Sequence, residues 1–187
     1  LEQVSSTVQE KVIDISLPEL WKKAASLAGY LAGMGALYLH DGGHLPTTLL
    51  PIVINADGEV DRLTINNLSF IEDSVRHGLT LLEENPKSHP IQLLMYDVYL
   101  NLPSRRTDAI CIDIRVYSHE QPLQLKFNIP YHKKTDVTPF RLEPLVVNKH
   151  YYVMTHKYQE EAKALLAALF YKEAFKFESE ITGPLWQ

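Results

Sequence analysis

The longest apolar stretch of the chain extends from Ala24 to Leu39, reads AASLAGYLAGMGALYL and contains no charged residue. It forms most of a segment from about Leu17 to Leu39, in which Ser16 suits the N-cap of a helix and Pro18 suits the first turn. A helix that is apolar on every side is buried in protein or in a membrane, and a membrane span needs roughly 20 apolar residues. Because this run is shorter and rich in glycine, it predicts a buried central helix and no membrane segment.

Gly29 and Gly33 lie four residues apart and therefore on one face of this predicted helix. Small residues at that spacing let another backbone approach closely. The approaching backbone belongs either to the same chain or to a second copy, and two-fold dimers are the commonest soluble assembly. A homodimer is therefore one expectation, and cover from within the chain is the other.

Two apolar runs on either side of Asp57 and Gly58 predict a β-hairpin. Glycine supplies the positive φ that a tight turn needs, so we expect strands at about Leu49–Asn55 and Glu59–Ile65. Proline cannot donate a hydrogen bond to a neighbouring strand. Pro51 therefore predicts that the first of these strands lies at the edge of its sheet.

Three strands are predicted after the proline-containing stretch ENPKSHP, at about Ile91–Leu100, Asp108–Ser118 and Leu123–Tyr131. The stretches LPSRRT and HEQP supply the turns between them. The middle one has strictly alternating apolar residues, which is typical of a strand with one buried face. The short run PLVV further on is an additional candidate strand. The alternating residues of the middle strand are Ile110, Ile112, Ile114 and Val116.

Helical spacing of apolar residues predicts a helix from about Leu68 to Glu84 and another from about His156 to Phe177, with Thr155 as the N-cap of the latter. We therefore expect one α+β domain over residues 1–187, with a loosely ordered arm at 1–15. Its mostly antiparallel sheet, a hairpin plus a three-stranded meander, carries helices on one face. The buried residues expected on the last helix are Leu165, Leu166, Leu169 and Phe170.

Composition narrows the class of protein. The 187 residues carry a net charge of −5, which argues against nucleic-acid binding because that needs a basic surface. Cys111 is the single cysteine, so no intrachain disulfide forms; we expect a cytoplasmic protein without a signal peptide. Three pairs of basic residues are scattered along the sequence and are interpreted as ordinary solvated charges: Lys22 and Lys23, Arg105 and Arg106, and Lys133 and Lys134.

The stretch HDGGH offers a candidate metal site. His40 and His44 with Asp41 have the ligand types that hold zinc or non-haem iron. However, Gly42 and Gly43 separate the two histidines, and a glycine in the left-handed conformation is the usual end of a helix. We therefore favour a helix C-cap over a metal site, and we expect no cofactor.

The polar side of the meander is the second candidate site. Alternation places Asp113, Arg115 and Tyr117 of the middle strand on one side, and we assign Asp97 and Tyr99 of the first strand to that side. A half-solvated sheet normally carries such a mixture, so the structural interpretation is a face open to water. Its functional use would be binding of a partner or ligand, or acid–base chemistry by the two aspartates. The same side also receives Cys111, His119, Lys126, Asn128 and His132.

The sequence contains none of the common catalytic motifs, such as G-x-S-x-G, H-E-x-x-H or a P-loop. We therefore expect a non-catalytic binding or adaptor module that uses the polar sheet face, with a protein or a small molecule as the partner. The alternative is a small enzyme or metal-binding protein. Its centre would be His40, Asp41 and His44, or the pair Asp97 and Asp113.

Overall fold

The computed structural model describes residues 17–63, 65–68, 71–147 and 159–180. In these residues eight strands form one antiparallel sheet in the order β2-β1-β4-β5-β6-β7, with β3 paired to β1 and β8 paired to β6. The predicted α+β class and mostly antiparallel sheet are confirmed. The elements are α1 (Glu19–His40), β1 (Thr47–Ile54), β2 (Val60–Leu63), β3 (Asn66–Leu68), α2 (Ile71–Glu84), β4 (Ile91–Leu102), β5 (Arg105–Val116), β6 (Leu123–His132), β7 (Arg141–Leu142), β8 (Val146–Val147), α3 (Gln159–Ala174) and the 3-10 helix η2 (Phe175–Glu180).

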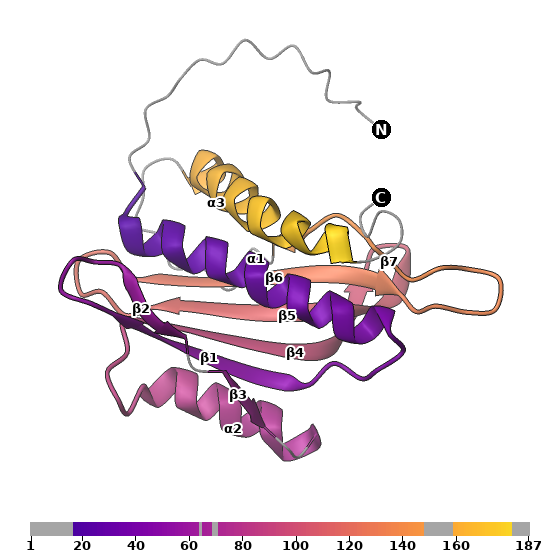
Figure 1. Ribbon diagram of the computed structural model, residues 1–187, viewed down its shortest axis with the longest axis horizontal. Helices are drawn as coiled ribbons and strands as arrows, with labels where there is room; N and C mark the ends of the chain where they lie inside the picture. The colour runs from indigo at the N-terminus through magenta and orange to yellow at the C-terminus, as the bar shows by residue number, and fades with distance from the viewer. Residues whose placement is uncertain (1–16, 64, 69–70, 148–158, 181–187) are drawn as a thin grey trace, which may run out of the picture.

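α1 packs on the sheet and against α3, so its side chains are buried on more than one side (Figure 1). Leu31 is fully buried, and the indole Nε1 of Trp21 donates to the backbone oxygen of Gln121 at 2.9 Å. The predicted buried central helix is confirmed. Pro18 takes the N-cap position, while the predicted cap, Ser16, lies outside the described residues. No helix among the described residues has the length and apolar character needed to span a membrane.

The two glycines of α1 make room for the last helix of the same chain. A Cβ atom at Gly29 would lie 2.0 Å from the backbone oxygen of Phe170 in α3. A Cβ atom at Gly33 would lie 2.2 Å from the ring of Phe177 in η2. The close approach is therefore used inside the monomer, and these glycines give no support to a homodimer.

α3 buries the residues that recur every four positions and face α1 and the sheet. Ala162, Leu166 and Phe170 are all fully buried. Leu165, which we expected on the buried face, is 42% exposed because it points away from that row. The predicted N-cap, Thr155, lies outside the described residues.

The predicted turn at Asp57 and Gly58 is confirmed by its geometry. Gly58 has φ +80°, and the backbone N–H of Asn55 donates to the oxygen of Glu59 at 2.9 Å. The side-chain oxygen of Asn55 also accepts from the N–H groups of Asp57 and Glu59 at 3.0 Å each. This side chain fixes the turn, as asparagine commonly does.

β1 pairs on both sides, so the prediction of an edge strand was wrong. β4 lies on one side of β1, and on the other side β3 pairs up to Leu49 and β2 from Ile52 onward. Pro51 lies in the gap between those two short strands. Its missing N–H is tolerated because no described strand pairs with β1 at that point on the outer side.

The reverse face of the sheet is apolar where β1 and β4 meet, and α2 packs there while α1 and α3 share the opposite face (Figure 1). The buried set on the reverse face includes Leu49, Leu94 and Cys111, which need cover from water. Leu82 of α2 is fully buried against them, and Gly78 allows the side chain of Leu94 to approach α2 closely.

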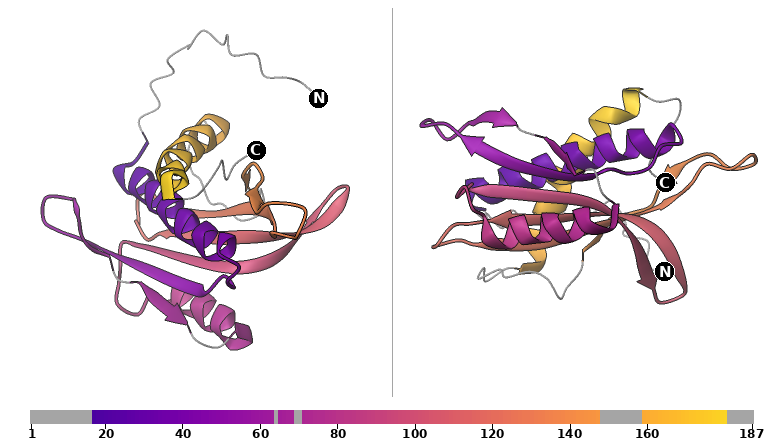
Figure 2. Two further views of the ribbon diagram at one scale, coloured as in Figure 1. Left: turned by 45° about the vertical axis from the view of Figure 1, so that its right-hand side comes forward. Right: turned by 90° about the horizontal axis from the view of Figure 1, so that it is seen from below.

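The three predicted strands of the meander are confirmed as β4, β5 and β6, and the run PLVV contributes β8. β4 and β5 pair over 12 residues each, up to a two-residue turn after Leu102. β1 reaches β4 only as far as Met95, and β6 reaches β5 only as far as Asp108. The β4–β5 hairpin therefore projects beyond the sheet as a two-stranded ribbon (Figure 2).

Candidate functional site

Asp113 of the predicted polar face is buried, with 2% of its surface exposed. Its Oδ2 lies 3.2 Å from Nζ of Lys126 and accepts from the hydroxyl of Tyr96 at 3.4 Å. Its Oδ1 lies 3.8 Å from Nε of Arg115, too far for a hydrogen bond. The expectation that this part of the face is open to water was therefore wrong, because β-strand neighbours enclose the carboxylate.

Arg115 and Tyr117 attach α2 to the sheet. The hydroxyl of Tyr117 donates to the backbone oxygen of Leu82 at 2.5 Å, and Nη1 of Arg115 lies 3.3 Å from a carboxylate oxygen of Glu83. Gln92 donates to the backbone oxygen of Leu81 at 3.1 Å. The last carbonyl groups of a helix lack partners within it, and Tyr117 supplies one for Leu82. Both candidates thus have a structural role.

Asp97 and Tyr99 lie on the other face of the sheet from Asp113, so our assignment of all three to one side was wrong. The register pairs Asp97 with Ile110 and Tyr99 with Asp108. Directly opposed residues share a face, and Ile110 belongs to the core on the α1 side. The proposed pair Asp97 and Asp113 is consequently separated by the sheet itself.

The HDGGH stretch ends α1 in the predicted cap. Gly42 has φ +83°; its N–H donates to the oxygen of Leu39 at 3.1 Å, and the N–H of Gly43 donates to the oxygen of Tyr38 at 2.9 Å. This pair of bonds is a Schellman motif. Nδ1 of His40 lies 3.2 Å from Oδ1 of Asp41, and the described residues contain no group of three histidine, cysteine or acidic side chains able to hold a metal.

Cys111 is 1% exposed on the α2 side of the sheet. Burial raises the pKa of its thiol to about 12, although a hydrogen bond with Tyr96 and the charge of Lys126 act in the opposite direction. A nucleophilic cysteine needs a lowered pKa and access to substrate. Cys111 is therefore a core residue.

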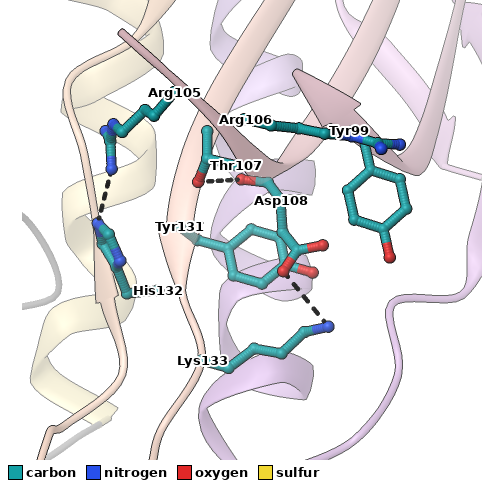
Figure 3. Close-up of a pocket in the computed structure, with 8 residues that line it drawn as sticks. All are labelled: Tyr99, Arg105, Arg106, Thr107, Asp108, Tyr131, His132 and Lys133. Atoms are coloured by element: carbon teal, nitrogen blue, oxygen red, sulfur yellow. Dashed lines mark hydrogen bonds and ion pairs between the residues drawn. The ribbon is translucent and has the colours of Figure 1, made fainter. Parts of the chain in front are cut away.

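An open hollow of about 510 Å³ lies at the projecting end of the β4–β5 hairpin, and we call it the hairpin-end hollow (Figure 3). It draws residues from the end of β4, the start of β5 and the end of β6. Its lining is rich in cationic and aromatic side chains: Tyr99, Arg105, Arg106, Thr107, Asp108, Tyr131, His132 and Lys133.

Arg106 reaches from β5 across to Tyr99 on β4, where its guanidinium lies 4.3 Å from the ring centroid (Figure 3). Tyr99 is 65% exposed. Arg106 forms no ion pair with any described residue, so the edge of its guanidinium remains available to a ligand. Nζ of Lys133 lies 3.4 Å from a carboxylate oxygen of Asp108.

Asp97 borders the same region and is held by Tyr131. The Tyr131 hydroxyl lies 3.0 Å and 3.1 Å from the two carboxylate oxygens and donates to them. Partial burial raises the pKa of Asp97, the hydrogen bond from Tyr131 lowers it, and the charge of Asp108 adds to the increase. The two hydrogen bonds direct the carboxylate towards the Tyr131 hydroxyl.

Behind the hollow, Glu143 joins the hairpin to β6. Arg105 donates to one of its carboxylate oxygens, and Nε2 of His132 lies 2.5 Å from the other. Burial alone would raise the pKa of Glu143, but its hydrogen bonds with His132 and Arg105 hold it below the usual value. This cluster braces the projecting hairpin and neutralises Arg105.

The basic residues of the hollow come from two of the three basic pairs of the sequence, Arg105 with Arg106 and Lys133 with Lys134. These pairs were predicted to be scattered, because the sequence does not show how far β6 extends alongside β5. The available signal was that each pair stands at the end of a predicted strand, on adjacent strands of one meander. Adjacent antiparallel strands bring such ends together.

No protein-family model, no curated protein and no solved structure matches the chain.

Proposed function

We propose that this protein is a non-catalytic binding module that receives an acidic segment of a partner protein at the hairpin-end hollow. The observation that carries the proposal is the convergence of Arg106 and Lys133 with the exposed ring of Tyr99 around an open hollow. Aromatic residues and arginine are the side chains most enriched at the centres of protein interfaces.

The charge of the hollow selects the kind of partner. Among the cationic lining residues, Arg105 is neutralised by Glu143 and Lys133 pairs with Asp108, which leaves Arg106 without an ion pair among the described residues, while the whole chain carries −5. The guanidinium of Arg106 matches the planar geometry of a carboxylate.

The alternative of a small enzyme or metal protein is less well supported. One of its two proposed centres, the pair Asp97 and Asp113, is divided between the two faces of the sheet. In the other, His40 and Asp41 end a helix. Elemental analysis of the purified, untagged protein tests that second centre, since a bound metal would be present in near-stoichiometric amount.

Two further parts of the proposal rest on the sequence. A single buried cysteine needs no oxidising compartment, so we place the protein in the cytoplasm. The glycines of α1 do not support a homodimer, because they pack against α3 and η2 of the same chain. We therefore propose that the partner at the hollow is another protein.

An eight-residue peptide of alternating glutamate and threonine is a suitable probe, with the glutamine–threonine peptide as its neutral counterpart. We expect saturable binding of the acidic peptide alone, with NMR shifts at Tyr99, Arg106 and Lys133, and weaker binding at higher salt. Absence of shifts at these residues at millimolar peptide would refute the proposal.

Charge reversal adds a matched control. Arg106→Glu and Lys133→Glu should each weaken binding of the acidic peptide by at least about tenfold, because each change replaces an attractive charge with a repulsive one. Lys87→Glu makes the same change in net charge in the exposed turn after α2, outside the lining of the hollow, and should alter the affinity less than about twofold. Equal effects of all three changes would show that only the net charge matters.

A further inference from the structure

The projecting part of β4 has an open edge. β1 pairs with β4 from Ile91 to Met95 and then ends, while β4 continues to Leu102. No described strand pairs with β4 on that side beyond Met95. The open edge is the side of β4 that faces away from β5, over residues 96–102.

The register fixes which backbone groups point outward from this edge. The N–H of Tyr117 donates to the oxygen of Pro90, so Pro90 and every second residue after it on β4 direct their backbone groups to β5. The intervening residues direct theirs to the opposite side. Beyond Met95 the outward set is Asp97, Tyr99 and Asn101.

The position of Pro51 is consistent with this alternation. Pro51 pairs with Gln92, a residue that directs its backbone groups to β5. In that pairing neither residue bonds to the other through its backbone, so the nitrogen of Pro51 points away from β4. It points into the gap between β2 and β3, where no described strand pairs with β1.

The charge beside the open edge distinguishes between possible occupants. An exposed strand edge is a template for another strand, and proteins often protect such edges with charged residues. Arg106 lies over Tyr99, so its charge is displaced from β5 towards the edge. A second copy aligned on the same edge would bring like charges together, whereas an acidic strand would meet a complementary charge.

We infer that the open edge of β4 takes up the acidic segment as an additional β-strand. This inference rests on the proposed function and specifies how the partner binds at Tyr99 and Arg106. Lys133 follows β6 on the other side of β5 and lies outside the added strand. Hydrogen bonds to Asp97, Tyr99 and Asn101 supply affinity that does not depend on sequence, and a carboxylate beside Arg106 supplies the preference for acidic residues.

Hydrogen exchange measured by NMR tests strand addition with the glutamate–threonine peptide. Saturating peptide should slow exchange of the amide protons of Asp97, Tyr99 and Asn101 at least tenfold. The amides of Val98 and Leu100 already face β5 and should change little.

A proline substitution supplies the matched variant. Asn101→Pro removes an outward N–H without removing a bond to β5, so we expect the fold to be retained. Peptide affinity should fall about fivefold relative to the control Asn101→Ala, which is the scale of one hydrogen bond.

Three other outcomes of these experiments would overturn one or both proposals. Peptide that binds at Arg106 without alternating protection would overturn strand addition and leave the binding module intact. Peptide that fails to bind at all would overturn both proposals. Protection that rises with protein concentration in the absence of peptide would make a second copy the occupant of the edge, against the inference.

Discussion

Asp97 and Asp113 lie on opposite faces of the same sheet, Asp97 paired with Ile110 and Asp113 paired with Leu94. Their surroundings differ accordingly. Asp113 is enclosed by strand neighbours with Lys126 at 3.2 Å, whereas Asp97 is more exposed and accepts a hydrogen bond from Tyr131. The same replacement of aspartate by asparagine should therefore have opposite effects on stability at the two positions.

Asp113→Asn should lower the free energy of unfolding by about 2 kcal/mol. Removing one partner of a buried ion pair typically costs about 3–5 kcal/mol, and partial exposure of Lys126 and Arg115 reduces that figure. Urea unfolding followed by circular dichroism measures it. The control is Asp61→Asn at an exposed position of β2, which should change stability by less than about 0.5 kcal/mol. A neutral Asp113→Asn would contradict the assignment of a buried charge.

Asp97→Asn should raise stability at neutral pH. The pKa of Asp97 is raised in the folded state, mainly by partial burial. At pH values above the ordinary aspartate pKa of about 3.9, the folded protein therefore holds the carboxyl proton of Asp97 more tightly than the unfolded chain does. Stability therefore falls as pH increases from about 3.9 through the folded pKa. The advantage of Asp97→Asn should appear above that window and vanish below it. Urea unfolding at pH 3.5 and pH 7 tests both signs, and a variant less stable at pH 7 would contradict the shift.

Alternation of apolar residues was enough to predict β4, β5 and β6, because one buried face imposes a period of two. It could not assign the faces of β4 and β5 relative to each other. That depends on the turn between Leu102 and Arg105, which contains two residues. One residue more or less in this turn would move every side chain of one strand to the other face. The sequence LPSRRT is compatible with several turn lengths, and this is why Asp97 was assigned to the wrong side.

The hollow was beyond prediction for a related reason. Arg106 and Lys133 are 27 residues apart, and their proximity follows from the antiparallel pairing that brings the start of β5 beside the end of β6, where Asp108 opposes Tyr131. Hydrophobic alternation stops at both places because neither strand end is buried there. Binding surfaces of this kind therefore leave the weakest periodic signal, although the charged pairs themselves are visible in the sequence.

Cys111 should resist alkylation in the folded protein. With the pKa of its thiol raised to about 12, the reactive thiolate is a very small fraction at pH 8, and the side chain is 1% exposed. Incubation with a thiol reagent such as dithionitrobenzoate at pH 8 should give no labelling over an hour, and complete labelling within minutes in urea. Rapid stoichiometric labelling of the native protein would show that the α2 side of the sheet opens readily.

Gly29→Ala should destabilise the protein more than Gly33→Ala. Alanine favours a helix over glycine by up to about 1 kcal/mol, so both changes would stabilise an exposed helix. At Gly29, however, the new methyl group would meet the backbone oxygen of Phe170 at 2.0 Å, and α3 would have to move as a whole. At Gly33 it would meet the ring of Phe177, a half-buried side chain that can rotate.

Overpacking of a core typically costs about 1–3 kcal/mol, so we expect a loss of about 2–3 kcal/mol for Gly29→Ala and about 1 kcal/mol or less for Gly33→Ala, measured by urea unfolding. Light scattering coupled to gel filtration provides the second measurement. If α3 supplies the cover of α1 within the monomer, the wild type and both variants should have the same molar mass, with a value of 21.4 kDa for a monomer. A wild-type dimer that dissociates on Gly29→Ala would instead place a second copy against α1. That result would contradict the packing of α3 on the two glycines.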